Sequence, residues 1–400
     1  MRILLLTQRL PYAPNRGDRV RAFHLLRVLR TFAEVDVVSF VHDAEEESQL
    51  TGMPEGTTVW AVPVPRVRNH LKALPSLAGA RPLTHLLLDS PKMPRALEEA
   101  AARRPDVLLA FGSGMARFCL VSPLKGVPLV LDMVDADSAK WASLAATAGF
   151  PMNWVYRREA RCLGAFEREV TRAATATTVV NERERDVLRR IAPEGEILAV
   201  PNGVDLSTLR PTGPPPQSQD VIFCGVMNYP PNEEGARWLA TDVWPAVRRT
   251  RPDARLMLVG SSPTRAVLDL ASESTGIVVT GSVPDVKPYL WSAAVSAAPL
   301  LTARGIQNKV LEAVAAGLPT VVTEPVYDGL PDEVRPACTL AADPRAFADA
   351  LLRDLALTPT ERRARAASAD LTSLSWETCL APFRTLLDRA AERPPYRVAV

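Results

Sequence analysis

Short apolar runs alternate with amphipathic segments along most of the chain. In its first half, runs of strand length fall at residues 2–7, 35–41, 57–64, 106–111, 128–133, 176–180 and 196–200. Helical patterns separate most of them, including a segment at 19–31 and a long charged one at 153–171. This alternation predicts an α/β fold with parallel strands. The Pro-interrupted stretch 65–95 fits neither pattern.

A proline-rich break divides the chain. Residues 211–219 read PTGPPPQSQ, which suits neither a helix nor a central strand. A second series of strand-like runs then follows at 221–224, 255–259, 276–280, 294–298 and 320–323. Helices are expected to begin near Asn232, Pro263, Pro284 and Gly305, and the tail 347–392 looks wholly helical. We therefore predict two Rossmann-like domains facing a cleft, residues 1–205 and 220–375, joined by a linker at 206–219. Ligands in such folds bind at the carboxyl ends of the strands.

Composition narrows the functional classes. The 400 residues suit two domains, and 47% hydrophobic with 23% charged residues is globular composition. A net charge of only +2 gives no overall positive field that would attract nucleic acid. Five scattered cysteines without a C-x-x-C pair, and four histidines without H-E-x-x-H, favour a reducing compartment and no metal site built on His ligands. No apolar run approaches the ~20 residues of a membrane span, so a cytoplasmic protein is expected.

The segment 302–319 carries the strongest chemical signal. It follows the strand-like run 294–298 and predicts a helix that begins near Gly305 and stops at Gly317. The first turn of a helix offers unpaired N–H groups to an anion, and Arg304 and Lys309 add positive charge there. Glu312, two turns in, could accept hydrogen bonds from sugar hydroxyls. The alternative is a surface glutamate paired with Lys309 at i, i+3 spacing.

These residues resemble a known motif. The sequence RGIQNKVLEA at 304–313, with Pro299–Leu300 before it and GLPTVV at 317–322 after it, is similar to the donor-site motif of glycosyltransferase family 4. The run 303–313 is closer still to the sugar transferases of PEP-CTERM/exosortase exopolysaccharide clusters, and the similarity spans nearly the whole chain. The resemblance implies a retaining enzyme of GT-B fold that needs no metal or other cofactor. It also implies that a helix at 376–400 packs back on the first domain.

The resemblance assigns roles to particular residues. It implies that Glu312 binds the ribose of a nucleoside-diphosphate sugar, and that the loop 280–285, with Gly281 and Val283, holds the base through its backbone. Residues 200–205 resemble the motif that closes the first domain. Further donor contacts are expected along the motif and in the loop after the first strand of the second domain, at Gly225, Asn228, Leu300, Gly305, Ile306 and Lys309. Asn232 in that loop could contact the donor or cap the next helix.

Two departures from the family pattern concern charge. Family 4 usually carries E-x7-E, but Arg304 stands where the first Glu is expected. The Arg and Lys that usually follow the first strand of the donor domain are also missing, since the sequence there reads FCGVMNYPPNEE at 223–234. We therefore expect Arg304 and Lys309 to neutralise the leaving diphosphate and, with Glu312 and Asp135, to form the catalytic set.

The acceptor side is expected in the first domain. The loop 9–19 follows the first strand, and the resemblance places acceptor or phosphate contacts at Arg16, Gly17 and Arg19. Asp18 could instead cap the following helix. The run LDMVDADS at 131–138 follows another strand. There Asp135 could accept the acceptor proton and Asp137 could bind the acceptor, although Asp137 or Ser138 could equally cap a helix.

Other functions fit the sequence less well. FGSGMAR at 111–117 imitates a dinucleotide-binding loop but lacks its last glycine and its position in the first strand–helix unit, so it reads better as a tight strand–helix turn. A nucleotide-sugar 2-epimerase of the same fold, or a catalytically silent nucleotide-sugar-binding protein, remains open. The expected partners are a nucleotide-sugar donor and a glycan or lipid-linked sugar acceptor, with no nucleic acid. Arg66, Arg68, His70 and Lys72, interleaved with Leu71 and Leu74, could touch the cytoplasmic membrane surface or form a solvated loop.

Overall fold

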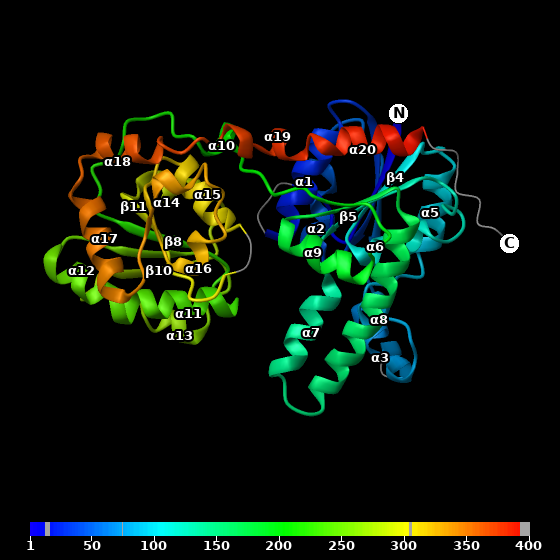
Figure 1. Cartoon of the computed structure of the whole chain (residues 1–400), viewed down its shortest axis with the longest axis horizontal. Coiled ribbons are helices and arrows are strands. Elements are labelled where there is room, and N and C mark those ends of the chain that lie inside the picture. Colours follow the sequence, from blue (N-terminus) through cyan, green and yellow to red (C-terminus); the bar gives the residue numbers. More distant parts are fainter. Residues whose placement is uncertain (13–16, 74, 304–305, 393–400) are drawn as a thin grey trace. The chain divides into compact units, whose positions relative to one another are not determined.

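The computed structural model describes residues 1–12, 17–73, 75–303 and 306–392 (Figure 1). The chain forms two compact units. The first comprises Met1–Pro201 and the segment that begins at Cys379, and the second comprises Asn202–Thr378. Each unit is described by itself.

The first unit contains a sheet of seven parallel strands in the order β3-β2-β1-β4-β5-β6-β7. All seven strands predicted from the sequence are confirmed. The strand order reverses between β1 and β4, where a doubly wound sheet opens a ligand crevice at its carboxyl edge. The strands are β1 (Arg2–Thr7), β2 (Glu34–Val41), β3 (Val59–Pro63), β4 (Val107–Phe111), β5 (Leu129–Val134), β6 (Ala176–Val179) and β7 (Ile197–Ala199).

Helices connect these strands and complete the first unit. Most residues of the inner strands are apolar because both faces of these strands are buried, as in Ile3–Leu6 of β1. The C-terminal helix contacts β4 and β5 through buried side chains such as Phe383 and Leu387. The helices are α1 (Gly17–Leu29), α2 (Ala44–Ser48), α3 (Arg66–Ala73), α4 (Leu83–Leu87), α5 (Met93–Ala101), α6 (Ser113–Cys119), α7 (Asp137–Thr147), α8 (Met152–Ala173), α9 (Glu182–Ile191) and α20 (Pro382–Ala391).

The second unit repeats this plan with six parallel strands in the order β10-β9-β8-β11-β12-β13. Its order reverses between β8 and β11. The strands are β8 (Val221–Cys224), β9 (Leu256–Val259), β10 (Ile277–Gly281), β11 (Val295–Ala298), β12 (Thr320–Val322) and β13 (Cys338–Leu340). The helices are α10 (Leu206–Leu209), α11 (Pro230–Trp238), α12 (Trp244–Thr250), α13 (Arg265–Leu268), α14 (Lys287–Ser292), α15 (Asn308–Ala315), α16 (Glu324–Tyr327), α17 (Pro344–Ala356) and α18 (Pro359–Ala366); α19 (Trp376–Leu380) spans the boundary between the units.

The structure differs from the sequence prediction in several places. The strand β13 was missed, because its three residues give no periodic signal. The tail is not wholly helical, since residues 367–375 separate α18 from α19 with only a short 3-10 turn between them. The predicted linker at 206–219 lies inside the second unit, where Arg363 holds the carbonyl of Gly213 at 2.7 Å. No helix in the described part of the chain is both long and apolar enough to cross a membrane.

A buried ion pair ties the first unit together. Arg21 of α1 and Asp132 of β5 form a two-pronged contact at 2.8 and 3.2 Å, and their side chains are 4% and 0% exposed. The hydroxyl of Thr178 in β6 donates to the same carboxylate at 2.9 Å. The third nitrogen of the Arg21 guanidinium donates to the carbonyl of Pro201 at 3.2 Å, and the guanidinium lies 5.9 Å from the ring of Phe383 in α20. One arginine thus connects a helix, a central strand and the C-terminal helix.

We predict that Asp132→Ala destabilises the protein strongly. The substitution leaves the Arg21 charge buried without its carboxylate, which typically costs about 3–5 kcal/mol of unfolding free energy. Urea unfolding followed by circular dichroism measures the loss. The exposed pair Arg265–Asp269, at 2.9 Å, supplies the control Asp269→Ala, which should leave the unfolding midpoint in place. Equal midpoints for the two variants would contradict the role given to Asp132.

Candidate functional site

The donor-side residues gather where β8 ends. Gly225 follows the strand directly, and Gly260 follows the neighbouring β9 with φ 149°. A Cβ atom on Gly260 would lie 1.8 Å from the carbonyl oxygen of Gly225, so only glycine allows the two loops to approach this closely. A Cβ on Gly225 would lie 2.8 Å from the amide nitrogen of Asn232 and 3.2 Å from the amine of Lys309. The missing side chain of Gly225 therefore makes room for these two polar groups.

Lys309 and Asn232 meet across 77 residues of sequence. The ammonium group of Lys309, the second residue of α15, donates to the side-chain oxygen of Asn232 at 2.6 Å. Asn232 is 6% exposed, and its amide nitrogen donates in turn to the carbonyl of Val226 at 2.9 Å. The amine also lies 4.8 Å from the ring centroid of Phe223, within range of a cation–π contact. Lys309 is thus a positioned cation at the carboxyl end of β8.

Burial sets the protonation of this cluster. It lowers the pKa of Lys309 to about 8, although Cys224 and Glu312 favour the charged form. It also raises the pKa of Glu312 to about 7, against the opposing effect of Lys309. The Cys224 thiol is held at a pKa of about 12 by burial and stays protonated. At neutral pH the cluster therefore carries a charged lysine beside a carboxyl group that is close to its midpoint.

The other predicted donor residues differ in burial and in their local contacts. Helix α15 begins at Asn308, three residues later than expected, so Glu312 lies about one turn into it. Asn232 does not cap α11, whose N-cap is Tyr229. Leu300 is buried in the core and its carbonyl accepts from the hydroxyl of Thr323, whereas Asn228 is exposed. Val283 and Ile306 pack partly buried on the core, and Gly281 ends β10 with φ 68° and open space around it. Arg304 and Gly305 lie outside the described residues.

The sequence reasoning missed Phe223 as part of this cluster. Its ring belongs to the core of the second unit, and it reads there as an ordinary strand residue. No spacing signal connects it with Lys309, because the contact depends on the packing of α15 on β11 and β12, of which β11 lies next to β8 in the sheet.

A strained strand end positions the acceptor-side carboxylates. Val134, the last residue of β5, has φ 69°, a left-handed conformation that is costly for a β-branched residue, and the pairing with β6 shifts register there. Asp135 follows directly and is exposed, whereas Asp132 faces Arg21 and Asp137 accepts from the Ser113 hydroxyl at 2.9 Å. Asp132 and Asp137 therefore have different partners, and Asp135 is the exposed carboxylate of the three.

Neither predicted cap holds at this turn. Ala136 is the N-cap of α7, and Asp137 and Ser138 are its first two residues.

The surroundings of Asp135 and Asp137 raise the pKa of both carboxyl groups. At Asp135, partial burial of the carboxyl group and the nearby carboxylate of Glu184 together raise the pKa above its usual value. Burial also raises the pKa of Asp137, against the opposing hydrogen bond from Ser113. A carboxylate with a raised pKa is a better proton acceptor, which suits Asp135 to general-base chemistry.

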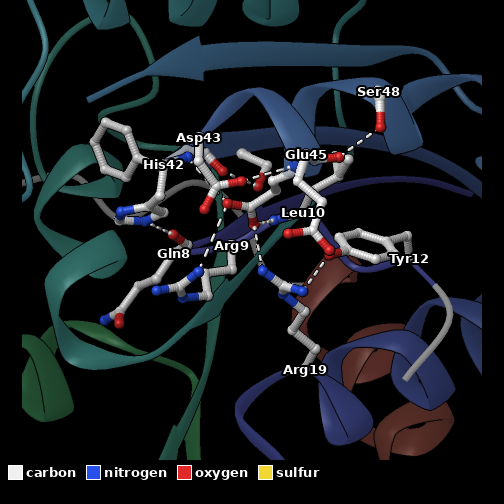
Figure 2. A network of polar contacts seen from close by, with 12 residues as sticks. Gln8, Arg9, Leu10, Tyr12, Arg19, His42, Asp43, Glu45 and Ser48 are labelled. Atoms are coloured by element: carbon white, nitrogen blue, oxygen red, sulfur yellow. Dashed lines mark hydrogen bonds and ion pairs between the residues drawn. The ribbon is translucent and has the colours of Figure 1, made fainter. Parts of the chain in front are cut away.

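A polar network fixes the loop that follows β1 (Figure 2). Its centre is Glu46 of α2, which is 0% exposed and accepts from the backbone N–H groups of Leu10 and His42, both at 2.9 Å. Arg9 and Arg19 approach the same carboxylate at 3.7 and 3.6 Å. Arg19 also donates to the hydroxyl of Tyr12 and lies over its ring, as Figure 2 shows.

This network changes the reading of the predicted acceptor loop. Arg19 is 3% exposed, and its contacts hold the loop in place. The structure therefore gives it a structural role and leaves it almost no exposed surface through which it would contact an acceptor. Helix α1 begins at Gly17, before Asp18, so Asp18 is not its N-cap. Arg16 lies outside the described residues. The turn after β4 is the tight strand–helix turn predicted, with Gly112 at φ 85° packed against the side chain of Gln8.

Two family models match successive parts of the chain. The "Glycosyl transferase 4-like domain" matches residues 16–203, and "Glycosyl transferases group 1" matches residues 218–356. The chain belongs to the glycosyltransferases. The two matches fall on the two sheets, so both halves of this enzyme are accounted for. No curated protein sequence matches the chain.

Solved glycosyltransferase structures share its fold. A sucrose-phosphate synthase from Thermosynechococcus elongatus is 18% identical, with a TM-score of 0.67 over 97% of this chain and 99% of that one. A trehalose-6-phosphate protein from E. coli bound with UDP-2-fluoro glucose is 14% identical, with a TM-score of 0.65 over 99% and 100%. HepE from Anabaena in complex with UDP is 13% identical, with a TM-score of 0.64 over 97% and 100%. These likenesses confirm the predicted GT-B type of α/β fold.

We predict that Gly225→Ala weakens nucleoside-diphosphate binding at least tenfold. The new methyl group would displace the Asn232 amide and the Lys309 amine, which are ends of movable side chains, so the fold should survive. Calorimetric titration with a panel of nucleoside diphosphates measures affinity, and a thermal melt checks folding. Gly213→Ala is the matched control, because a Cβ atom added at Gly213 would have nothing within 4 Å. Unchanged affinity in a folded Gly225→Ala variant would remove Gly225 from the site.

Proposed function

We propose that this glycosyltransferase moves a sugar, with retention of anomeric configuration, from a nucleoside-diphosphate sugar to a glycan or lipid-linked acceptor in exopolysaccharide or cell-envelope polysaccharide synthesis. The observation that carries the donor half is the positioned, partly buried ammonium group of Lys309 at the carboxyl end of β8. Two solved neighbours hold UDP or a UDP sugar, which supports a nucleotide-sugar donor. The resemblance to exopolysaccharide transferases supports the acceptor class.

Lys309 would stabilise the leaving diphosphate. A unit charge about 4 Å from a phosphate oxygen contributes about 4 kcal/mol at an effective dielectric near 20. This is enough to replace one of the cations that the loop after β8 lacks. Arg304 is proposed as the second cation on the basis of the sequence, and Glu312 would hold the ribose hydroxyls. The loop 280–285 would hold the base, and the Asp285 carboxylate fixes the end of this loop by accepting from the Lys287 backbone N–H at 3.0 Å.

The transfer step is proposed as a front-face displacement. The bond between the anomeric carbon and the diphosphate oxygen breaks while the acceptor oxygen bonds to that carbon from the same face. The acceptor proton passes to the leaving phosphate oxygen or to Asp135, whose raised pKa suits a base. Atoms and charge balance without a metal ion or a covalent enzyme intermediate. In the part of the chain that the structure describes, no three His, Cys, Asp or Glu side chains cluster as metal ligands.

We predict that Lys309→Met lowers kcat/KM for the sugar donor by well over tenfold, because it removes the charge that the departing diphosphate needs. Steady-state kinetics with the preferred nucleotide sugar, found in a thermal-shift screen, measures the effect. Arg304→Met is expected to behave in the same way. Lys125→Met, which removes an exposed lysine of the first unit, is the control and should leave the kinetics unchanged. Unchanged kinetics in both active-site variants would contradict the proposal.

We predict that Asp135→Asn abolishes most transfer while leaving donor affinity intact, because an amide cannot accept the acceptor proton. Donor Kd is measured by calorimetry and transfer by product formation. Asp186→Asn, an exposed carboxylate in α9 of the same unit, should retain full activity. Full activity in Asp135→Asn would leave the leaving phosphate as the sole base.

A further inference from the structure

The α7–α8 hairpin of the first unit ends in an apolar tip. Between the two helices, Phe150 is 87% exposed, and Trp154 in the first turn of α8 is 53% exposed. Leu144 and Met152 are each 44% exposed. Figure 1 shows this hairpin extending away from the sheet of its unit, with its turn at the far end. Large apolar side chains gathered on one exposed element usually mark a surface that another body covers.

A second exposed apolar ridge lies on α3. Val67 is 79% exposed and Leu71 is 68% exposed, and they stand one turn apart on one face of the helix. They line a depression of about 750 Å³ together with His42, Val64 and Pro65. The exposed residues Arg66 and Arg68 flank this ridge.

Hydrogen bonds join α8 to the chain after α3. Arg158 of α8 is 3% exposed and donates to the carbonyls of Ser76, Leu77 and Arg81 at 2.9, 2.8 and 2.8 Å. Its neighbour Glu159 accepts from the backbone N–H groups of Leu83 and Thr84 at 2.8 and 2.9 Å, at the start of α4. Trp154 lies one turn before Arg158 on the same side of α8. The hairpin and the α3 region are therefore held together as parts of one body.

The charge of these two segments is one-sided. Residues 56–88 and 138–158 contain no Asp or Glu, although the chain as a whole has almost as many acidic as basic residues. Their exposed basic residues are Arg66, Arg68, Arg81, Lys140 and Arg157, whereas Arg158 is buried and pairs with Glu159 at 3.2 Å. Exposed aromatic and aliphatic side chains beside arginines, with no carboxylate in either segment, match a negatively charged lipid surface. A second copy of the chain would bring like charges together and is disfavoured.

We infer that Phe150, Trp154, Val67 and Leu71, with Arg66 and Arg68, form a docking surface for an anionic bilayer; we call these six residues the docking surface. The apolar side chains enter the headgroup boundary and the arginines pair with lipid phosphates. This inference rests on the proposed function for its purpose, since it would bring the enzyme to a lipid-linked acceptor. Binding to vesicles requires neither donor nor acceptor, so either claim can fail while the other stands.

The test is co-sedimentation of the full-length protein with vesicles. Wild type should bind vesicles that contain phosphatidylglycerol and phosphatidylcholine, bind pure phosphatidylcholine far more weakly, and dissociate as salt rises. Phe150→Ser with Trp154→Ser should weaken binding more than tenfold. Arg66→Gln with Arg68→Gln should weaken it roughly 30-fold, given about 1 kcal/mol for each basic residue near such a surface.

Matched controls lie in the second unit. Leu268→Ser removes a side chain that is also 44% exposed, and Arg249→Gln with Arg353→Gln removes two exposed arginines. Both control variants should bind as wild type does, and thermal melts should show that every variant folds. The inference is overturned if wild type does not sediment with anionic vesicles at low salt, or if variants of the docking surface bind as the controls do. It is also overturned if the substitutions only dissociate a dimer that has no affinity for vesicles.

Discussion

The donor half of this enzyme depends on keeping a lysine charged where water is largely excluded. Removing an ammonium group from water costs several kcal/mol unless nearby dipoles compensate. The carboxamide oxygen of Asn232 lies 2.6 Å from the amine and the Phe223 ring lies beside it, but burial still lowers the pKa of Lys309 to about 8. Because the hydrogen-bonded partner is a neutral amide, the positive charge stays available to a diphosphate. The glycines at 225 and 260 give this cluster its space.

The same topological rule places chemistry in both units. Each sheet reverses its strand order once, between β1 and β4 in the first unit and between β8 and β11 in the second. The loop fixed by Glu46 follows β1, and Gly225 follows β8, so each lies at the carboxyl edge beside its reversal point. In the first unit the ion pair of Arg21 with Asp132 holds β5, which lies beside β4 in the sheet. The Asp132 carboxylate is therefore occupied by structural contacts. The next carboxylate along the chain, Asp135, is exposed and open to chemistry.

The strands and the donor motif could be predicted from the sequence because they depend on local patterns. Buried parallel strands read as apolar runs, and the helix of Glu312 is followed two residues after its end by Gly317 with φ 84°, a strong local stop signal. The contacts that decide chemistry could not be read in this way. Lys309 contacts Asn232, which is 77 residues away in the sequence, and Arg21 contacts Asp132, which is 111 residues away. Contacts over such separations leave no periodic pattern that a sequence could show. Helix caps were predicted poorly for Asn232, Asp137 and Ser138, because a residue that is able to cap is not always placed at the helix start.

The most direct test of the account is proton uptake on nucleoside-diphosphate binding at pH 8. At this pH Lys309 is about half protonated, Glu312 is mostly ionised, and the terminal phosphate is already ionised. A bound diphosphate should raise the pKa of Lys309 and also that of Glu312, and Lys309 alone should draw on the order of half a proton from the buffer. Calorimetry in buffers of different ionisation enthalpy measures this uptake. Uptake in wild type that falls in Lys309→Met, with any remainder lost when Glu312→Gln is added, supports the central claim, and binding without uptake in wild type contradicts it.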